Sequence, residues 1–436
     1  MHFIKFLIFI LFTSSLYADD ISIGQKDFSR LTKMLHKQVN KGNYPGFFTL
    51  IQKDGELVYS DIVGFSNIEE GVKLHKDSLF RIYSMTKPIT GVALMIAVDK
   101  GLVNLSDPVS KYIPEFAATK VLSENNSDLL DLTKPITLLE LATHTSGLAY
   151  SFSIKGKIKE FYEKQKIYPY YAIDNFNDDL SLDKFYSNIC EFSQKVATIP
   201  LAHQPGDKWT YSIGMDILGC VIERAAKITF GKFLEENIFE PLDMNDTFFQ
   251  VPKDKRFRMT NLYAHIDGFD QFGVEPPKGD KKSKSKLVLV DKANSSAYFN
   301  KVSIEDGGSG LVSSAQDYLK FGQMLLERGV YQGKRIISEE SYRTLISNQL
   351  NEKNQRFDAF GFGITLGISI DSSKLRQKKG DGSFFWGGAA KTKFWVDPEN
   401  NLVLVNMTQL LGSPKDLGRK IDKLVYKDLK KFEKIN

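Results

Sequence analysis

Three stretches of this sequence place a serine three residues before a lysine, the spacing at which an amine can activate a hydroxyl nucleophile. They are Ser84–Lys87, Ser181–Lys184 and Ser283–Lys286. A serine hydroxyl is a weak nucleophile until a base removes its proton. Residues three apart lie on the same face of a helix, about 5 to 6 Å between Cβ atoms, so the lysine can supply that base. Because the spacing alone gives three matches, the surrounding residues must select among them.

The surroundings favour Ser84 as the nucleophile and Lys87 as its base. Ser283 lies in the lysine-rich stretch Lys278–Lys286, which we expect to be a solvated loop, and solvent keeps an amine protonated. Ser181 follows two aspartates and is typical of a helix N-cap. Ser84 instead follows a largely apolar tetrapeptide and begins a hydrophobic helix. Desolvation beside that helix would favour the neutral amine, the form of Lys87 that accepts a proton.

The elements that position this helix are predicted to include an antiparallel sheet built from both ends of the chain. After a helix at 27–41, the alternating segments 46–52 and 56–64 flank Lys53-Asp54-Gly55, which is typical of a β-hairpin. A final polar helix at about 415–431 is expected to cover one face of the sheet. Segments rich in aromatic and β-branched residues are predicted to add strands at 360–370, 384–396 and 402–407.

The middle of the chain carries helical patterns instead. Apolar residues recur at three- and four-residue spacing in 93–102, 137–143, 215–227 and 314–328. The fold class expected is therefore α/β with an all-α subdomain. We predict one domain at 19–436, whose α/β part covers about 25–103 and 301–436 and whose helical part covers about 104–300.

Composition and charge narrow the class of protein. The chain has 436 residues, 42% hydrophobic and 25% charged, so it can bury a sizeable core. Its formal net charge of +5 is slight for this length and argues against nucleic acid as a partner. Residues 1–18 have the layout of a signal peptide, with Lys5, an apolar run at 6–12 and a cut after Ala18. A bilayer span needs about 20 apolar residues. We therefore expect export to the periplasm or outside the cell, with no stable membrane span after removal of the signal.

The cysteines and histidines bear on two questions, disulfide pairing and metal binding. The two cysteines, Cys190 and Cys220, would be able to pair in an oxidising compartment, and two buried thiols fit the sequence equally well. The six histidines show no metal-binding spacing, so no metal or cofactor is expected. The sequence does not indicate an oligomeric state.

Four further motifs follow Ser84-Met85-Thr86-Lys87 along the chain. They are Leu141-Ala142-Thr143-His144-Thr145-Ser146-Gly147-Leu148, Pro205-Gly206-Asp207-Lys208-Trp209-Thr210-Tyr211-Ser212, the glycine-rich segment Gly307–Ser314, and Trp386-Gly387-Gly388-Ala389. In this order and spacing, the five segments resemble the serine β-lactamase and penicillin-binding protein superfamily. Within it, they are most similar to the class C β-lactamases and the family VIII carboxylesterases.

The resemblance implies a fold and a set of roles. The fold would be β-lactamase/transpeptidase-like, an antiparallel sheet flanked by helices, with the active site in the cleft between this α/β part and the all-α subdomain. Tyr211 would be the second base, facing Ser84 and Lys87 across that cleft. The backbone amides of Ser84 and Ala389 would form the oxyanion hole. The loop at His144 and the glycine-rich segment would be structural.

Two departures from the β-lactamase pattern concern substrate recognition. The third motif of the superfamily, usually Lys-Thr-Gly, is best matched by Trp386-Gly387-Gly388 rather than by Lys391-Thr392-Lys393. The two glycines would let a substrate approach the backbone closely, and Trp386 offers an aromatic surface to an apolar acyl or alcohol group. The asparagine of the Tyr-x-Asn pattern is replaced by Ile213, whose side chain cannot hydrogen-bond a substrate amide. We expect all four of these positions, Trp386, Gly387, Gly388 and Ile213, to contact the substrate.

The function expected is hydrolysis of a small-molecule ester or amide through an acyl-enzyme, with a carboxylesterase favoured. A class C-type β-lactamase and a D-amino-acid peptidase remain open, as does an inactive binding protein of the same fold. An α/β-hydrolase fits poorly, because Gly-x-Ser-x-Gly does not occur in the sequence.

Overall fold

The computed structural model describes residues 24, 27–125, 127–167, 186–266, 286–355, 358–374, 380–412 and 417–432. The predicted signal peptide at 1–18, the pair Ser181–Lys184 and Ser283 lie outside these residues. Within the described ranges, no helix combines the length and the apolar character that crossing a bilayer requires.

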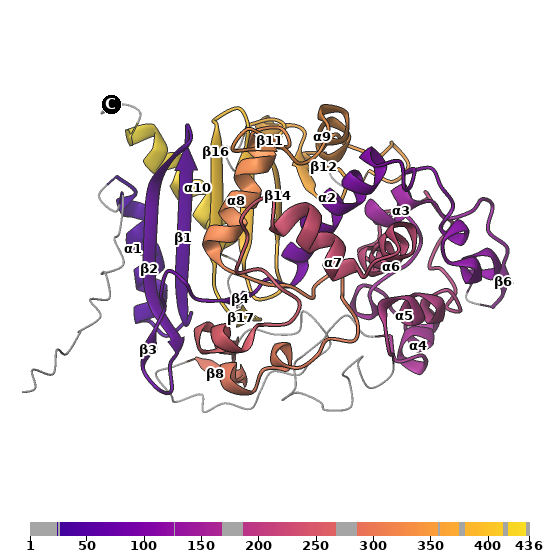
Figure 1. Cartoon of the computed structure of the whole chain (residues 1–436), viewed down its shortest axis with the longest axis horizontal. Coiled ribbons are helices and arrows are strands. Elements are labelled where there is room, and N and C mark those ends of the chain that lie inside the picture. Colours follow the sequence, from indigo (N-terminus) through magenta and orange to yellow (C-terminus); the bar gives the residue numbers. More distant parts are fainter. Residues whose placement is uncertain are drawn as a thin grey trace, which may run out of the picture.

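An eight-stranded antiparallel sheet forms one end of the molecule (Figure 1). Its order is β12-β13-β14-β15-β16-β1-β2-β3, so strands from the two ends of the chain meet where β1 pairs with β16. The predicted hairpin is confirmed, and Asp54 and Gly55 in its turn take positive φ angles of 54° and 84°. The strands are β1 Gly46–Lys53, β2 Glu56–Asn67, β3 Val72–Lys73, β12 Phe360–Phe362, β13 Gly367–Ser369, β14 Phe384–Gly387, β15 Lys393–Asp397 and β16 Leu402–Met407.

Two segments predicted as strands are each a hairpin of two short strands. Segment 360–370 folds back between β12 and β13, where the amide of Gly363 donates to the carbonyl of Leu366 at 2.8 Å. Segment 384–396 folds back between β14 and β15, where the amide of Gly388 donates to the carbonyl of Thr392 at 2.9 Å. Neither turn contains proline or an Asn-Gly pair, which explains why the apolar pattern concealed it.

Helices cover both faces of the sheet. On one face, α1 (Ser29–Asn40) and α10 (Gly418–Phe432) pack on a cluster that includes Trp395 and Leu404. The two helices are joined by Arg30, whose guanidinium donates to Asp428 at 2.7 Å. On the other face lies α8 (Ala315–Leu326), where the ring of Tyr318 contacts Phe394 at 4.9 Å between centroids. The predicted antiparallel sheet flanked by helices is therefore confirmed, with the final helix covering one face.

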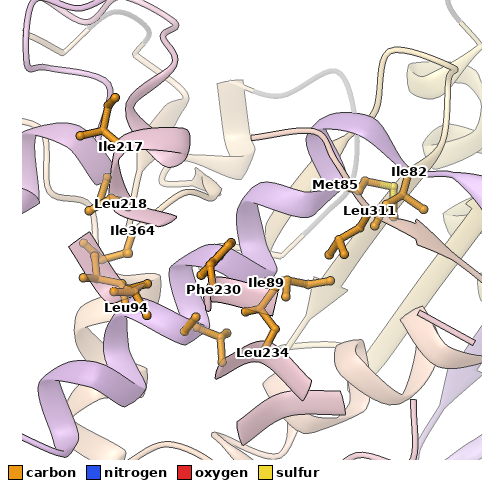
Figure 2. Packing of buried hydrophobic residues seen from close by; sticks show 14 of the residues in the cluster. Ile82, Met85, Ile89, Leu94, Ile217, Leu218, Phe230, Leu234, Leu311 and Ile364 are labelled. Atoms are coloured by element: carbon orange, nitrogen blue, oxygen red, sulfur yellow. The ribbon is translucent and has the colours of Figure 1, made fainter. Parts of the chain in front are cut away.

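The other end of the molecule is helical and is built around α2 (Thr86–Asp99). Every residue of α2 from Thr86 to Ala97 is buried, so apolar side chains surround it on all sides. Figure 2 shows side chains of α2, α6 and α7 gathered there, with Ile89 near Phe230 and Leu234. The helices of this part are α3 Leu138–Ala142, α4 Lys157–Lys164, α5 Ile189–Val196, α6 Gly214–Ala226, α7 Phe230–Leu234 with a π-helical turn at Glu235–Phe239, and α9 Glu339–Ile346.

A disulfide links α5 to α6 through Cys190 and Cys220, which settles the pairing that the sequence left open. Short strands complete the fold: β4 Phe80–Arg81 with β9 Val312–Ser313, β5 Val121–Leu122 with β6 Leu129–Leu130, β10 Val330–Tyr331 with β11 Lys334–Arg335, and β7 Leu262–His265 between β8 Leu287–Asp291 and β17 Leu410–Leu411. Strands β7 and β8 fall inside the range 104–300, and β7 pairs with β17 of the C-terminal part. The predicted boundaries between the α/β part and the helical part of the domain stay a prediction.

Candidate active site

Ser84 lies in a single 3₁₀ turn, Tyr83–Met85, that leads into α2. The helix predicted to begin at Ser84 begins two residues later, after this turn, in which Tyr83 takes a left-handed φ of 43°. The turn is held from behind, since the Tyr318 hydroxyl donates to the carbonyl of Met85 at 2.7 Å. This places the Ser84 side chain at the partly exposed end of a buried helix.

The structure brings the three predicted side chains together around the Ser84 oxygen. The hydroxyl of Tyr211 donates to Ser84 Oγ at 2.8 Å, from a loop 127 positions later in the chain. The Nζ of Lys87 donates to the same oxygen at 3.3 Å. The Ser84 hydroxyl thus has an amine and a phenol within reach, groups that can accept and donate protons. Nucleophilic catalysis by serine requires such an arrangement.

Lys87 is completely buried, and the hydrogen-bond acceptors of its Nζ among the described residues are uncharged oxygen atoms. Besides Ser84, Nζ donates to the Tyr150 hydroxyl at 2.9 Å and to the carbonyl of Gly308 at 2.7 Å. Sequence reasoning missed both partners. Tyr150 stands two residues after the His-Thr-Ser-Gly-Leu motif, and Gly308 lies in the segment expected only to pack beside the site. Their positions next to two of the motifs were the available signal.

A pair of buried carboxyl groups supports the Gly308 carbonyl from behind. Asp306 accepts hydrogen bonds from the amides of Gly308 at 2.5 Å and Ser309 at 2.9 Å. Asp216 of α6 lies against Asp306, and burial together with the charge of Asp306 raises the pKa of Asp216 well above its usual value. The protonated form of Asp216 is therefore favoured, which lets two carboxyl groups share this buried space.

Aromatic rings fix the orientation of Tyr211. His144 packs edge-on against it at 4.7 Å between centroids, and Trp209 stacks at 6.2 Å. The amide of Ser212 donates to His144 Nδ1 at 3.2 Å. Burial, with a smaller effect from the charge of Lys87, lowers the pKa of His144 well below its usual value, so the imidazole is neutral. These contacts agree with the structural role predicted for His144.

The turn between β14 and β15 lies directly against the segment that carries Ser84. The Thr392 hydroxyl donates to the carbonyl of Ile82 at 3.4 Å. A Cβ atom on Gly388 would lie 2.4 Å from that same carbonyl oxygen, so only glycine allows this approach. Ala389, the predicted second oxyanion donor, packs against the hydrophobic cluster that contains Tyr83.

The remaining predicted residues divide between the site and the core. The ring of Trp386 contacts Tyr211 at 5.9 Å between centroids, and Gly387 joins it to the turn. Ile213 is only 2% exposed and packs in the main core, so its contact with a substrate stays a prediction. Lys393 forms an ion pair with Asp422 of α10 on the opposite face of the sheet. Lys391 lines a cavity of about 390 Å³ on that α10 side.

Comparison with known proteins agrees with this geometry. A family model described as Beta-lactamase matches residues 31–426. The chain belongs to the Beta-lactamase family. Members of this family similar to the chain include Protein Rv1367c of Mycobacterium tuberculosis, 32% identical over 84% of this chain and 86% of that protein. Esterase EstB of Burkholderia gladioli is 26% identical over 87% of this chain and 90% of that protein.

A solved structure shares the fold of this chain. The structure described as EstCE1, a hydrolase with promiscuous acyltransferase activity, matches with a TM-score of 0.72 at 20% identity, over 92% of this chain and 99% of that chain. The β-lactamase/transpeptidase-like fold and the resemblance to class C and family VIII proteins are therefore confirmed. The chain is a serine hydrolase of the Beta-lactamase family.

Proposed function

We propose that the chain is a carboxylesterase that hydrolyses small-molecule esters through an acyl-enzyme on Ser84. One observation carries the proposal: Ser84 Oγ is hydrogen-bonded at once by Tyr211 at 2.8 Å and by the buried Lys87 at 3.3 Å. The name of Esterase EstB, a relative that spans nearly the whole chain, supports the ester as substrate.

In the acylation step, Ser84 Oγ bonds to the ester carbonyl carbon while Lys87, in its neutral form, takes the hydroxyl proton. Tyr211 gives its own proton to the leaving oxygen as the bond between the carbonyl carbon and that oxygen breaks. The proton that Lys87 took from Ser84 then passes to the deprotonated Tyr211, and an alcohol departs. Positioned acids and bases of this kind contribute about 10² to 10⁴-fold each.

The charge that develops on the carbonyl oxygen needs two donors close to Ser84. We assign them to the backbone amides of Ser84 and Ala389, because the Gly388 turn lies against the segment that leads into Ser84. Preorganised amides of this kind are worth about 10² to 10³-fold in rate each. In the second step, water attacks the acyl-enzyme by the same proton route and releases the acid.

Three features favour an ester over a β-lactam. Trp386 stands where the β-lactamase pattern has a lysine, so a cation is missing from that motif position. Lys393 is engaged by Asp422 on the α10 side of the sheet. Ile213 is buried and offers no hydrogen bond to the acylamino group of a β-lactam. A carboxylate and an amide on the substrate would therefore find little recognition here.

The test compares kcat/KM for a short-chain p-nitrophenyl ester with that for a chromogenic cephalosporin on one preparation. We expect the ester to be preferred by at least about 100-fold. A preference for the cephalosporin would overturn the esterase proposal in favour of a class C-type β-lactamase, and turnover only of D-amino-acid peptides would favour a peptidase.

An inactive binding protein is distinguished by labelling rather than by turnover. A fluorophosphonate reacts with an activated serine irrespective of the natural substrate, so intact-mass measurement should show one adduct on the native chain and none on Ser84→Ala. A folded native chain that takes no label would favour the binding protein.

We also propose a periplasmic or secreted location, as the N-terminal residues suggest. The disulfide between Cys190 and Cys220 supports it, because disulfides persist in oxidising compartments. Thiol alkylation of intact cells before and after reduction tests this: the pair should be alkylated only after reduction. Alkylation without reduction would argue for a reducing compartment.

A further inference from the structure

A pocket with an entirely apolar lining lies beside Tyr211. It measures about 320 Å³, and its wall consists of aromatic residues, one leucine and glycines. The side chains that shape it are Trp209, Leu350, Phe360, Phe362, Phe385 and Trp386. An apolar cavity of about 150 Å³ holds a benzene molecule, so this one can hold a benzyl group or a larger ring system. Its walls supply no charged group to compensate for burying a carboxylate or an ammonium.

The pocket wall is continuous with the Tyr211 ring, which ties it to the reacting atoms. Trp209 stacks on Tyr211 with 6.2 Å between centroids, and Trp386 contacts it at 5.9 Å. Phe362 joins the two tryptophans, at 5.6 Å from Trp209 and 5.3 Å from Trp386. The pocket is therefore joined to Tyr211 through the two tryptophans. Lys87 Nζ and the Tyr150 ring also contact the Tyr211 ring, at 4.9 Å and 5.0 Å from its centroid.

We propose that this pocket binds the alcohol portion of the ester, and that the alcohol is an apolar, preferably aromatic one. The inference rests on the proposed function. Tyr211 must come within hydrogen-bond distance of the leaving oxygen to give it a proton, and the group attached to that oxygen then extends along the Tyr211 ring toward Trp209 and Trp386. When the bond between carbonyl carbon and oxygen breaks, the alcohol leaves with the proton from Tyr211, and the acyl group stays on Ser84.

Two isomeric esters test the assignment, because they differ only in which side of the carbonyl carries the ring. Benzyl acetate has its ring on the alcohol and methyl phenylacetate has it on the acid, while both leaving alcohols have similar acidity. Release of acid followed by pH-stat gives kcat/KM for both with one readout. We expect benzyl acetate to be preferred at least tenfold, as burial of an apolar group in a fitting pocket provides about 10 to 200-fold.

Variants of the pocket residues then test whether the pocket causes the preference for benzyl acetate. Leu350→Ser exposes a hydroxyl in the wall and should lower the ratio of the two kcat/KM values at least fivefold, and Phe362→Leu should lower it in the same direction. Leu130→Ser is the matched control, since Leu130 is 48% exposed in the β5–β6 hairpin and lies outside the pocket lining. Its ratio should equal that of the native chain.

The outcomes separate this inference from the proposed function. Equal or reversed preference in a native chain whose Ser84 still takes a fluorophosphonate label would overturn the alcohol pocket and leave the esterase proposal standing. A ratio that Leu350→Ser and Phe362→Leu both leave unchanged would also overturn it. Absence of labelling and of turnover of either ester would reject the proposed function, and the pocket assignment with it.

Discussion

Replacing Gly388 by alanine should disable the site without touching a side chain that reacts. The new Cβ would lie 2.4 Å from the carbonyl oxygen of Ile82 and 2.2 Å from Thr392 Oγ1, whereas an ordinary contact begins near 3.4 Å. Thr392 can rotate, but the Ile82 oxygen belongs to the backbone that leads into Ser84. The turn therefore has to move away from Ser84 by about 1 Å, and the Ala389 amide moves with it.

The expected loss of kcat follows from this displacement of the turn. Misplacement by about 1 Å costs about 10²-fold in rate, and loss of one oxyanion donor costs about 10² to 10³-fold. We expect kcat of Gly388→Ala on a p-nitrophenyl ester to fall 100-fold or more, equivalent to at least about 2.7 kcal/mol of transition-state stabilisation. The KM should change less, because the aromatic pocket wall is untouched. Fluorophosphonate labelling should slow in parallel.

The adjacent glycine provides the control. A Cβ on Gly387 would meet a single atom, the carbonyl oxygen of Thr392 at 3.2 Å, so a shift of a few tenths of an ångström accommodates it. We expect Gly387→Ala to lose less than about tenfold in kcat. Equal losses in the two variants, or an unchanged kcat in a Gly388→Ala protein of native melting temperature, would refute the link between this turn and the oxyanion hole.

Three further changes probe the base, the buried carboxyl pair and the disulfide. Tyr211→Phe should lower kcat about 10² to 10⁴-fold with the fold intact by circular dichroism; normal turnover would place the proton donor elsewhere. Asp216 has a raised pKa through burial and Asp306, so the native state keeps its proton while the unfolded chain loses it from about pH 4 upward, and stability falls as pH rises through that window. Asp216→Asn should therefore lose less stability than the native chain as pH rises above about 4 in urea titrations, and parallel curves would contradict this. Replacing Cys190 and Cys220 by serine opens a loop of 30 residues and should cost about 3.6 kcal/mol of unfolding free energy relative to the oxidised native chain. The reduced native chain is the control and should match the variant.

The sequence predicted best what depends on local pattern. The β1–β2 hairpin, the helical segments and the Ser84–Lys87 pair all follow from spacing along a few residues, and the structure places each near its predicted position. Tyr211 could be found only through the family motif, because nothing in 18 scattered tyrosines singles it out. Its hydrogen bond to Ser84 spans 127 positions, a separation that no local pattern encodes.

What the sequence did not show depends on contacts made after folding. Tyr150 and Gly308 become partners of Lys87 only when separate loops meet behind α2. The hairpin at Gly388 was hidden because its turn is built from glycine and alanine within an apolar run. The raised pKa of Asp216 arises from burial and from the neighbouring Asp306, a residue 90 positions away whose proximity is a property of the packed core alone.

The pairing of β1 with β16 also governs when this protein becomes an enzyme. Thr49 on β1 and Asn406 on β16 share a hydrogen bond across 357 positions, and between them lie both Ser84 and the Ala389 turn. Closing so long a loop is slow, because its entropy is lost before the contacts compensate for it. A chain still emerging from the ribosome thus holds its nucleophile without its oxyanion turn, so activity should arise in a single late step that coincides with insertion of the last central strand.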